Sequence, residues 1–112
     1  MDDLLTGGGE ASHFLGRVYG LKAWSLGGLG RLPEAERTAH QSLAISPENA
    51  DGHLTLAALY NGRNQWAESL AQLDTLLAWY PNYQAAVMMR QGVLDRMREQ
   101  GAAPASGVSP RR

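Results

Sequence analysis

The sequence carries the same pattern of residues twice, 34 positions apart, between Gly16 and Pro81. This interval separates Pro47 from Pro81 and Ala23 from Ala57, and it recurs in four further pairs: Leu32 and Trp66, Glu34 and Glu68, Leu43 and Leu77, and Ile45 and Trp79. A period of this length with two helical patterns in each copy is typical of helix-turn-helix repeats that stack on one another. The repeat therefore predicts an all-α structure whose general function is to hold another molecule, without indicating which molecule.

Apolar residues recurring every three or four positions, with helix-breaking residues between the runs, predict five helices. Ser12 is expected to cap the first helix, because Gly7, Gly8 and Gly9 disfavour a helix before it, and Asn64 is expected to cap the fourth. The expected helices run over these residues: 12–28, 33–45, 48–62, 64–80 and 82–99.

Both copies resemble the tetratricopeptide repeat, which reads Trp-x2-Leu-Gly-x2-Tyr in its first helix, then Ala-x3-Phe and a closing Pro in its second. The second copy supplies, in order, His53, Leu56, Ala57, Tyr60, Ser69, Leu73 and Pro81. The first supplies Tyr19, Lys22, Ala23, Leu26, Ala35, Ala39 and Pro47, with Lys22 as the clear departure. The resemblance implies a short right-handed α-solenoid of about five helices.

The same resemblance implies a domain organisation of two repeats and a cap. The repeats are expected at residues 12–47 and 48–81, and a capping helix at 82–100, where Arg90 and Gln91 occupy positions that would face a following helix. Residues 1–11 are expected to form a flexible leader. Residues 101–112 are expected to form a disordered tail, since they are rich in Ala, Pro, Ser and Gly.

In this family the first helices of successive repeats line a concave groove. The resemblance places the groove positions at Arg17, Gly20, Trp24, Leu54, Ala58, Asn61, Met88 and Arg96. This mixed apolar and polar set suits a peptide or helix of a protein partner, and Gly20, Gly27 and Gly28 leave room for a backbone to approach. The alternative interpretation is that Trp24 and Met88 pack against neighbouring segments, and that Arg17 and Arg96 are simply solvated. Because Gly20 and Trp24 stand where some family members have a Lys and an Asn that grip a terminal carboxylate, a carboxylate clamp is not expected.

Composition and motifs argue against the other function classes. The chain has no cysteine, and His13, His40 and His53 share no metal-ligand spacing, so no metal, cofactor or catalytic site is predicted. His53 occupies a family packing position and is expected in the core or at its boundary, not as a metal ligand. The net charge of −1 and the absence of a basic stripe indicate no nucleic-acid binding. No apolar run is long enough for membrane insertion, and no signal peptide precedes it, so a cytoplasmic protein is expected.

Two repeats and a cap form a thin structure, since three or more repeats are usually needed for stability. We therefore expect the open N-terminal face to be covered by a second copy of the chain or by a larger partner. Two functions remain open. The first is an adaptor or chaperone-like protein that binds a partner's peptide in its groove. The second is a structural subunit of a larger assembly, such as a secretion, pilus or enzyme complex, docked through its helix faces.

Overall fold

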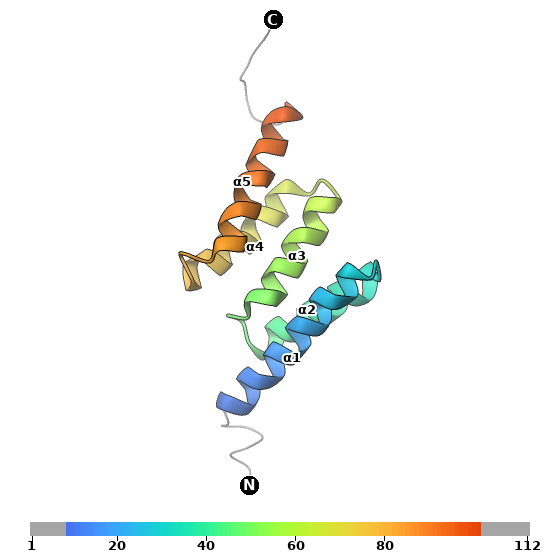
Figure 1. Cartoon of the computed structure of the whole chain (residues 1–112), viewed down its shortest axis with the longest axis vertical. Helices are drawn as coiled ribbons and strands as arrows, with labels where there is room; N and C mark the ends of the chain where they lie inside the picture. Colours follow the sequence, from blue (N-terminus) through green and yellow to red (C-terminus); the bar gives the residue numbers. More distant parts are fainter. Residues whose placement is uncertain (1–8, 102–112) are drawn as a thin grey trace, which may run out of the picture.

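The structure, a computed structural model, describes residues 9–101 and folds them into five helices connected by short turns (Figure 1). Their bounds are α1 Gly9–Gly28, α2 Leu32–Ile45, α3 Ala50–Gly62, α4 Trp66–Trp79 and α5 Gln84–Glu99. No strand occurs within these residues, and the all-α prediction is confirmed. None of the five helices combines the length and apolar character needed to cross a bilayer.

The helices lie in two layers, with α1, α3 and α5 in front of α2 and α4 in the view of Figure 1. Helix α1 packs on α2, α3 packs on both of them and on α4, and α5 packs on α4. Two helical hairpins, α1–α2 and α3–α4, therefore stack with their leading helices side by side, followed by α5. This is the architecture of a short α-solenoid, as the repeat predicts.

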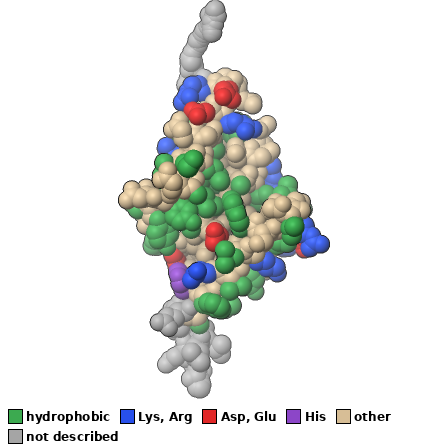
Figure 2. Space-filling view, viewed as in Figure 1, with side chains coloured by type: hydrophobic (Ala, Val, Ile, Leu, Met, Phe, Trp, Pro, Cys, Tyr) green, Lys and Arg blue, Asp and Glu red, His purple; other side chains and the backbone are tan. Residues whose placement is uncertain are grey.

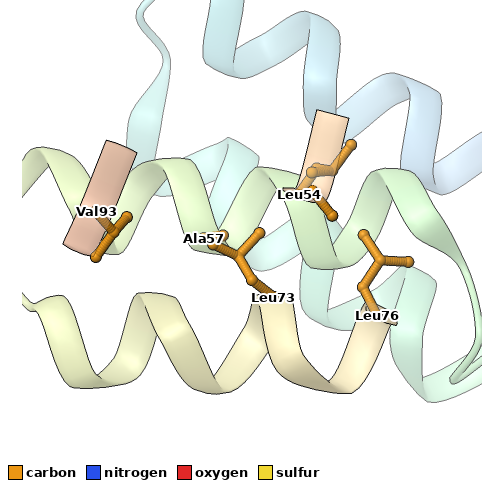
Figure 3. Close-up of a cluster of buried hydrophobic side chains, with 6 residues drawn as sticks. Leu54, Ala57, Leu73, Leu76 and Val93 are labelled. Carbon is orange, nitrogen blue, oxygen red and sulfur yellow. The ribbon is translucent and has the colours of Figure 1, made fainter. Parts of the chain in front are cut away.

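A buried cluster connects the second hairpin to α5. Leu73 and Leu76 of α4 point toward α3 (Figure 3), and they share the cluster with Leu54 and Ala57 of α3 and Val93 of α5. Two smaller clusters, one of Ala23, Ala39 and Leu56 and one of Leu26, Ala35 and Leu59, join α1 and α2 to α3. The alanines of the repeat pattern are thus completely buried where helices pack against each other.

The turn between the two hairpins depends on Gly20 of α1. Asn49 caps α3 by accepting a hydrogen bond from the amide of Gly52 at 2.8 Å. A side chain at Gly20 would meet the Asn49 carboxamide and the Cβ atom of Asp51, because the backbone of α1 runs directly over this cap. The glycine at position 20 is therefore required by the packing of α1 on the start of α3.

We predict that Gly20→Ala lowers the free energy of unfolding by about 1–3 kcal/mol, because overpacking forces neighbouring groups to shift. Gly28→Ala is the matched control in the same helix, since nothing lies within 4 Å of a Cβ atom added there. The control is expected to leave stability unchanged or raise it by up to about 1 kcal/mol. Urea unfolding followed by circular dichroism measures both, and equal effects of the two variants would contradict the close contact.

All five helices begin one to three residues away from the predicted starts, and two of these differences concern a predicted cap. Helix α1 begins at Gly9 rather than Ser12, so residues 9–11 are helical and not part of a leader. Glycine is tolerated at the start of a helix, where it costs less than in the helix interior. Asn64 does not cap α4; it adopts φ +60°, a left-handed conformation that asparagine tolerates, and Gln65 takes the N-cap position. The predictions for residues 1–8 and 102–112 lie outside the described residues.

Candidate functional site

A pocket of about 410 Å³ lies between the leading helices α1 and α3, on the side toward the α1–α2 turn. We call it the Trp24 pocket. Its lining is mainly apolar and consists of Trp24, Gly27, Gly28, Leu32, Thr55, Ala58, Leu59, Gly62 and Arg63. The layer of α1, α3 and α5 faces the viewer in Figure 2, where hydrophobic side chains gather over the middle of the molecule.

The pocket exists because glycines occupy the ends of both leading helices. Nothing lies within 4 Å of a Cβ atom added at Gly28 or at Gly62, so both positions border open space. Trp24 and Leu32 stand at the margins with 46% and 44% of their surface exposed, whereas Leu59 is buried in the core beneath. Any other residue at these two positions would project a side chain into this space.

An ion pair at the edge of the pocket involves its only charged lining residue. Arg63 donates a hydrogen bond to Glu36 Oε1 of α2 at 2.6 Å, and this bond holds the pKa of Glu36 below its ordinary value. Because the guanidinium is already paired, the pocket offers mainly apolar contact. It can accept a large apolar side chain.

Only two of the eight predicted groove residues line the Trp24 pocket. Trp24 and Ala58 line the Trp24 pocket together. Leu54 is buried in the core with 4% exposure, and Gly20 is buried against the cap of α3, so neither presents a side chain to a groove.

The remaining predicted residues are spread along the layer. Met88 is 64% exposed on α5, and the Arg96 guanidinium lies 5.7 Å from the centre of the Trp66 ring. Asn61 is half-buried, and its carboxamide oxygen has no hydrogen-bond partner within the described part of the chain. None of these three residues lines the Trp24 pocket, and their contact with a partner stays a prediction.

Arg17 lies in a second, more polar pocket of about 250 Å³, beside His13, Glu48, Asp51, Tyr80 and Tyr83. Burial raises the pKa of the Asp51 carboxyl, and the nearby charge of Arg17 acts in the opposite direction. His13 Nδ1 lies 3.3 Å from Glu48 Oε2, which also accepts a hydrogen bond from Ser46 at 2.7 Å. These contacts stabilise the turn that precedes α3. The lining carries both positive and negative side chains, so we interpret this pocket as part of the packing between α1 and that turn.

Sequence reasoning missed five residues of the pocket lining, namely Leu32, Thr55, Leu59, Gly62 and Arg63. One signal was present, because Gly28 and Gly62 are themselves separated by the repeat interval of 34. Equivalent glycines at the ends of two leading helices indicate a position that the repeat keeps free of side chains. By contrast, nothing in the sequence shows that Leu32 of the second helix borders the same pocket.

The histidines behave as structural residues. His53 is buried, with Nε2 at 2.7 Å from the Pro47 carbonyl oxygen and Nδ1 at 2.8 Å from Gln72 Oε1, so its predicted core position is confirmed. Among residues 9–101, no group of three or more His, Cys, Asp or Glu side chains is placed to hold a metal ion.

Comparison with protein families gives a match. A family model described as tetratricopeptide repeat matches residues 28–91, more than half of the chain, from the end of α1 into α5. No curated protein and no solved structure matches the chain.

Proposed function

The chain belongs to the tetratricopeptide repeat family, whose members are generally protein–protein interaction modules, and we propose that it is a non-enzymatic adaptor that holds a segment of a partner protein. In this proposal a large apolar side chain of the partner's peptide or helix enters the Trp24 pocket. The observation that carries the proposal is the apolar, open lining of this pocket between the two leading helices.

The dimensions of the pocket suit such an anchor. Its volume of about 410 Å³ lies within the range of about 300–1,000 Å³ typical of pockets that enclose a ligand. Gly28 and Gly62 allow the partner's backbone to come close, and Trp24 supplies a large, half-exposed aromatic surface of the kind enriched among residues that dominate binding. Burying one large apolar side chain contributes about 1.5–3 kcal/mol, so further contacts along the layer must add to a stable complex.

Site-specific photocrosslinking tests this proposal. A photoreactive phenylalanine analogue replaces Leu32, at the margin of the pocket, and in a control chain it replaces Thr75, which is exposed on α4. The probe at Leu32 is expected to capture a defined partner protein, identified by mass spectrometry, and the probe at Thr75 is not. Equal capture by both probes would contradict a partner seated in the pocket.

A second candidate function is that of a structural subunit built into a larger assembly. It is favoured by the apolar side chains of α1 that the other described residues leave exposed. Different substitutions are expected to impair the two functions. Trp24→Ala and Asn61→Ala are expected to weaken partner binding in the first, whereas changes at Phe14 or Val18 are expected to abolish assembly in the second.

A further inference from the structure

The outer face of α1 is apolar and is not covered by any described part of the chain. Phe14 is 64% exposed, Leu21 52%, Leu15 48% and Val18 43%, although each is a residue type that usually lies inside. The buried side of the same helix carries Gly16, Gly20, Ala23 and Leu26. Helix α1 therefore has two apolar sides, and only one of them has a partner in the structure.

Three of these residues, together with the exposed Ser25, follow a spacing that reads the same in both directions. Phe14, Val18, Leu21 and Ser25 are separated by four, three and four positions, and at 3.6 residues per turn they fall within an arc of about 60°. We call these four residues the α1 seam. Such alternating spacings of three and four are those of helices that pack along a shared seam.

We propose that the α1 seam binds the α1 seam of a second copy of the chain, with the two helices antiparallel. Because the spacing is palindromic, an antiparallel copy brings Val18 level with Leu21 and Phe14 level with Ser25. The largest seam residue then lies opposite the smallest, which fills the interface evenly, as close-packed protein interiors require. A parallel pair would instead set Phe14 against Phe14 and leave a gap between the two serines.

The charges of α1 are compatible with this arrangement. Arg17 and Lys22 lie on opposite edges of the seam, and neither belongs to an ion pair within the described residues. In the antiparallel pair each cation is offset from its own copy by five residues, or about 7.5 Å along the axis, so like charges do not meet directly. The chain's net charge of −1 opposes association only weakly.

The contact area of the proposed dimer is small. Helix α1 has 20 residues and is thus about 30 Å long, and one helix pair of this length buries less than the roughly 1,200–2,000 Å² of a standard interface. The dimer is therefore a concentration-dependent one that dissociates on dilution. It uses a face of α1 different from the edge that carries Trp24, so it is separable from the proposed peptide-binding function.

Sedimentation equilibrium from low to high micromolar concentration tests the dimer. The full chain is expected to pass from monomer to dimer, and Val18→Glu is expected to stay monomeric with an unchanged circular dichroism spectrum. Val87→Glu on α5 is the matched control, since Val87 is 42% exposed and lies off the seam, and it is expected to dimerise normally. A full chain that is monomeric throughout, or a dimer broken by Val87→Glu and not by Val18→Glu, would overturn the proposal.

Crosslinking between introduced cysteines tests the orientation of the two helices. The chain has no cysteine of its own, so only the introduced positions react. Phe14→Cys and Ser25→Cys chains are mixed and treated with a short bismaleimide. The predicted product joins position 14 of one copy to position 25 of the other. Predominant joining of two copies through position 14, or no joined product above the background of a Thr75→Cys control, would overturn the antiparallel seam.

Discussion

Leu73→Ala is expected to lower the free energy of unfolding by about 2–5 kcal/mol, a large part of the roughly 5–15 kcal/mol that stabilises a typical domain. Leu73 is completely buried at the centre of the cluster that joins α3, α4 and α5 (Figure 3). Its truncation removes apolar contact and leaves a cavity that a thin two-layer structure fills only partly.

Urea unfolding followed by circular dichroism measures this effect. Leu29→Ala provides the control, because Leu29 is 74% exposed and its truncation is expected to change stability by no more than about 0.5 kcal/mol. If Leu73→Ala were as mild as Leu29→Ala, α4 would not pack against α3 and α5 as described.

Gly62→Leu is expected to weaken partner binding by about tenfold to a hundredfold while the fold stays intact. The new side chain projects into the Trp24 pocket, where nothing lies within 4 Å of an added Cβ atom, and it excludes an anchor worth about 1.5–3 kcal/mol. Replacing a helical glycine also favours the helix by up to about 1 kcal/mol, so loss of binding is not a consequence of unfolding.

The matched control is Gly92→Leu. Gly92 lies on α5, it too has open space around an added Cβ atom, and it does not line the pocket. Isothermal titration calorimetry measures the affinity of each variant for the partner protein that photocrosslinking identifies. Equal affinities would show that the partner binds elsewhere, whereas the dimer formed through the α1 seam is expected to survive both changes.

The sequence was sufficient for the fold because the repeat interval constrains several residues at once. Ala23 and Ala57, one interval apart, both lie completely buried between packed helices. Pro47 and Pro81 both follow the end of a second helix of a hairpin. Each position alone is weak, but a shared interval is satisfied only if the two hairpins have the same geometry.

The site was less predictable, since spacing places a residue on one side of its own helix and does not show what lies opposite. Leu54 was expected in the groove, yet α4 and α5 approach from that side and bury it. Gly62 was treated only as the end of a helix, although its missing side chain helps to form the pocket. Asn64 was expected to cap α4 because its side chain suits that position, but the turn needed its tolerance of positive φ instead.

Nuclear Overhauser effects between methyl groups test most directly whether α1 and α3 lie side by side and enclose the Trp24 pocket. We expect contacts between the methyl groups of Ala23 and Leu56, and between the Trp24 ring and the methyl group of Ala58. Contacts confined to pairs within each hairpin, with none linking α1 to α3, would contradict the stacked arrangement and the binding site that depends on it.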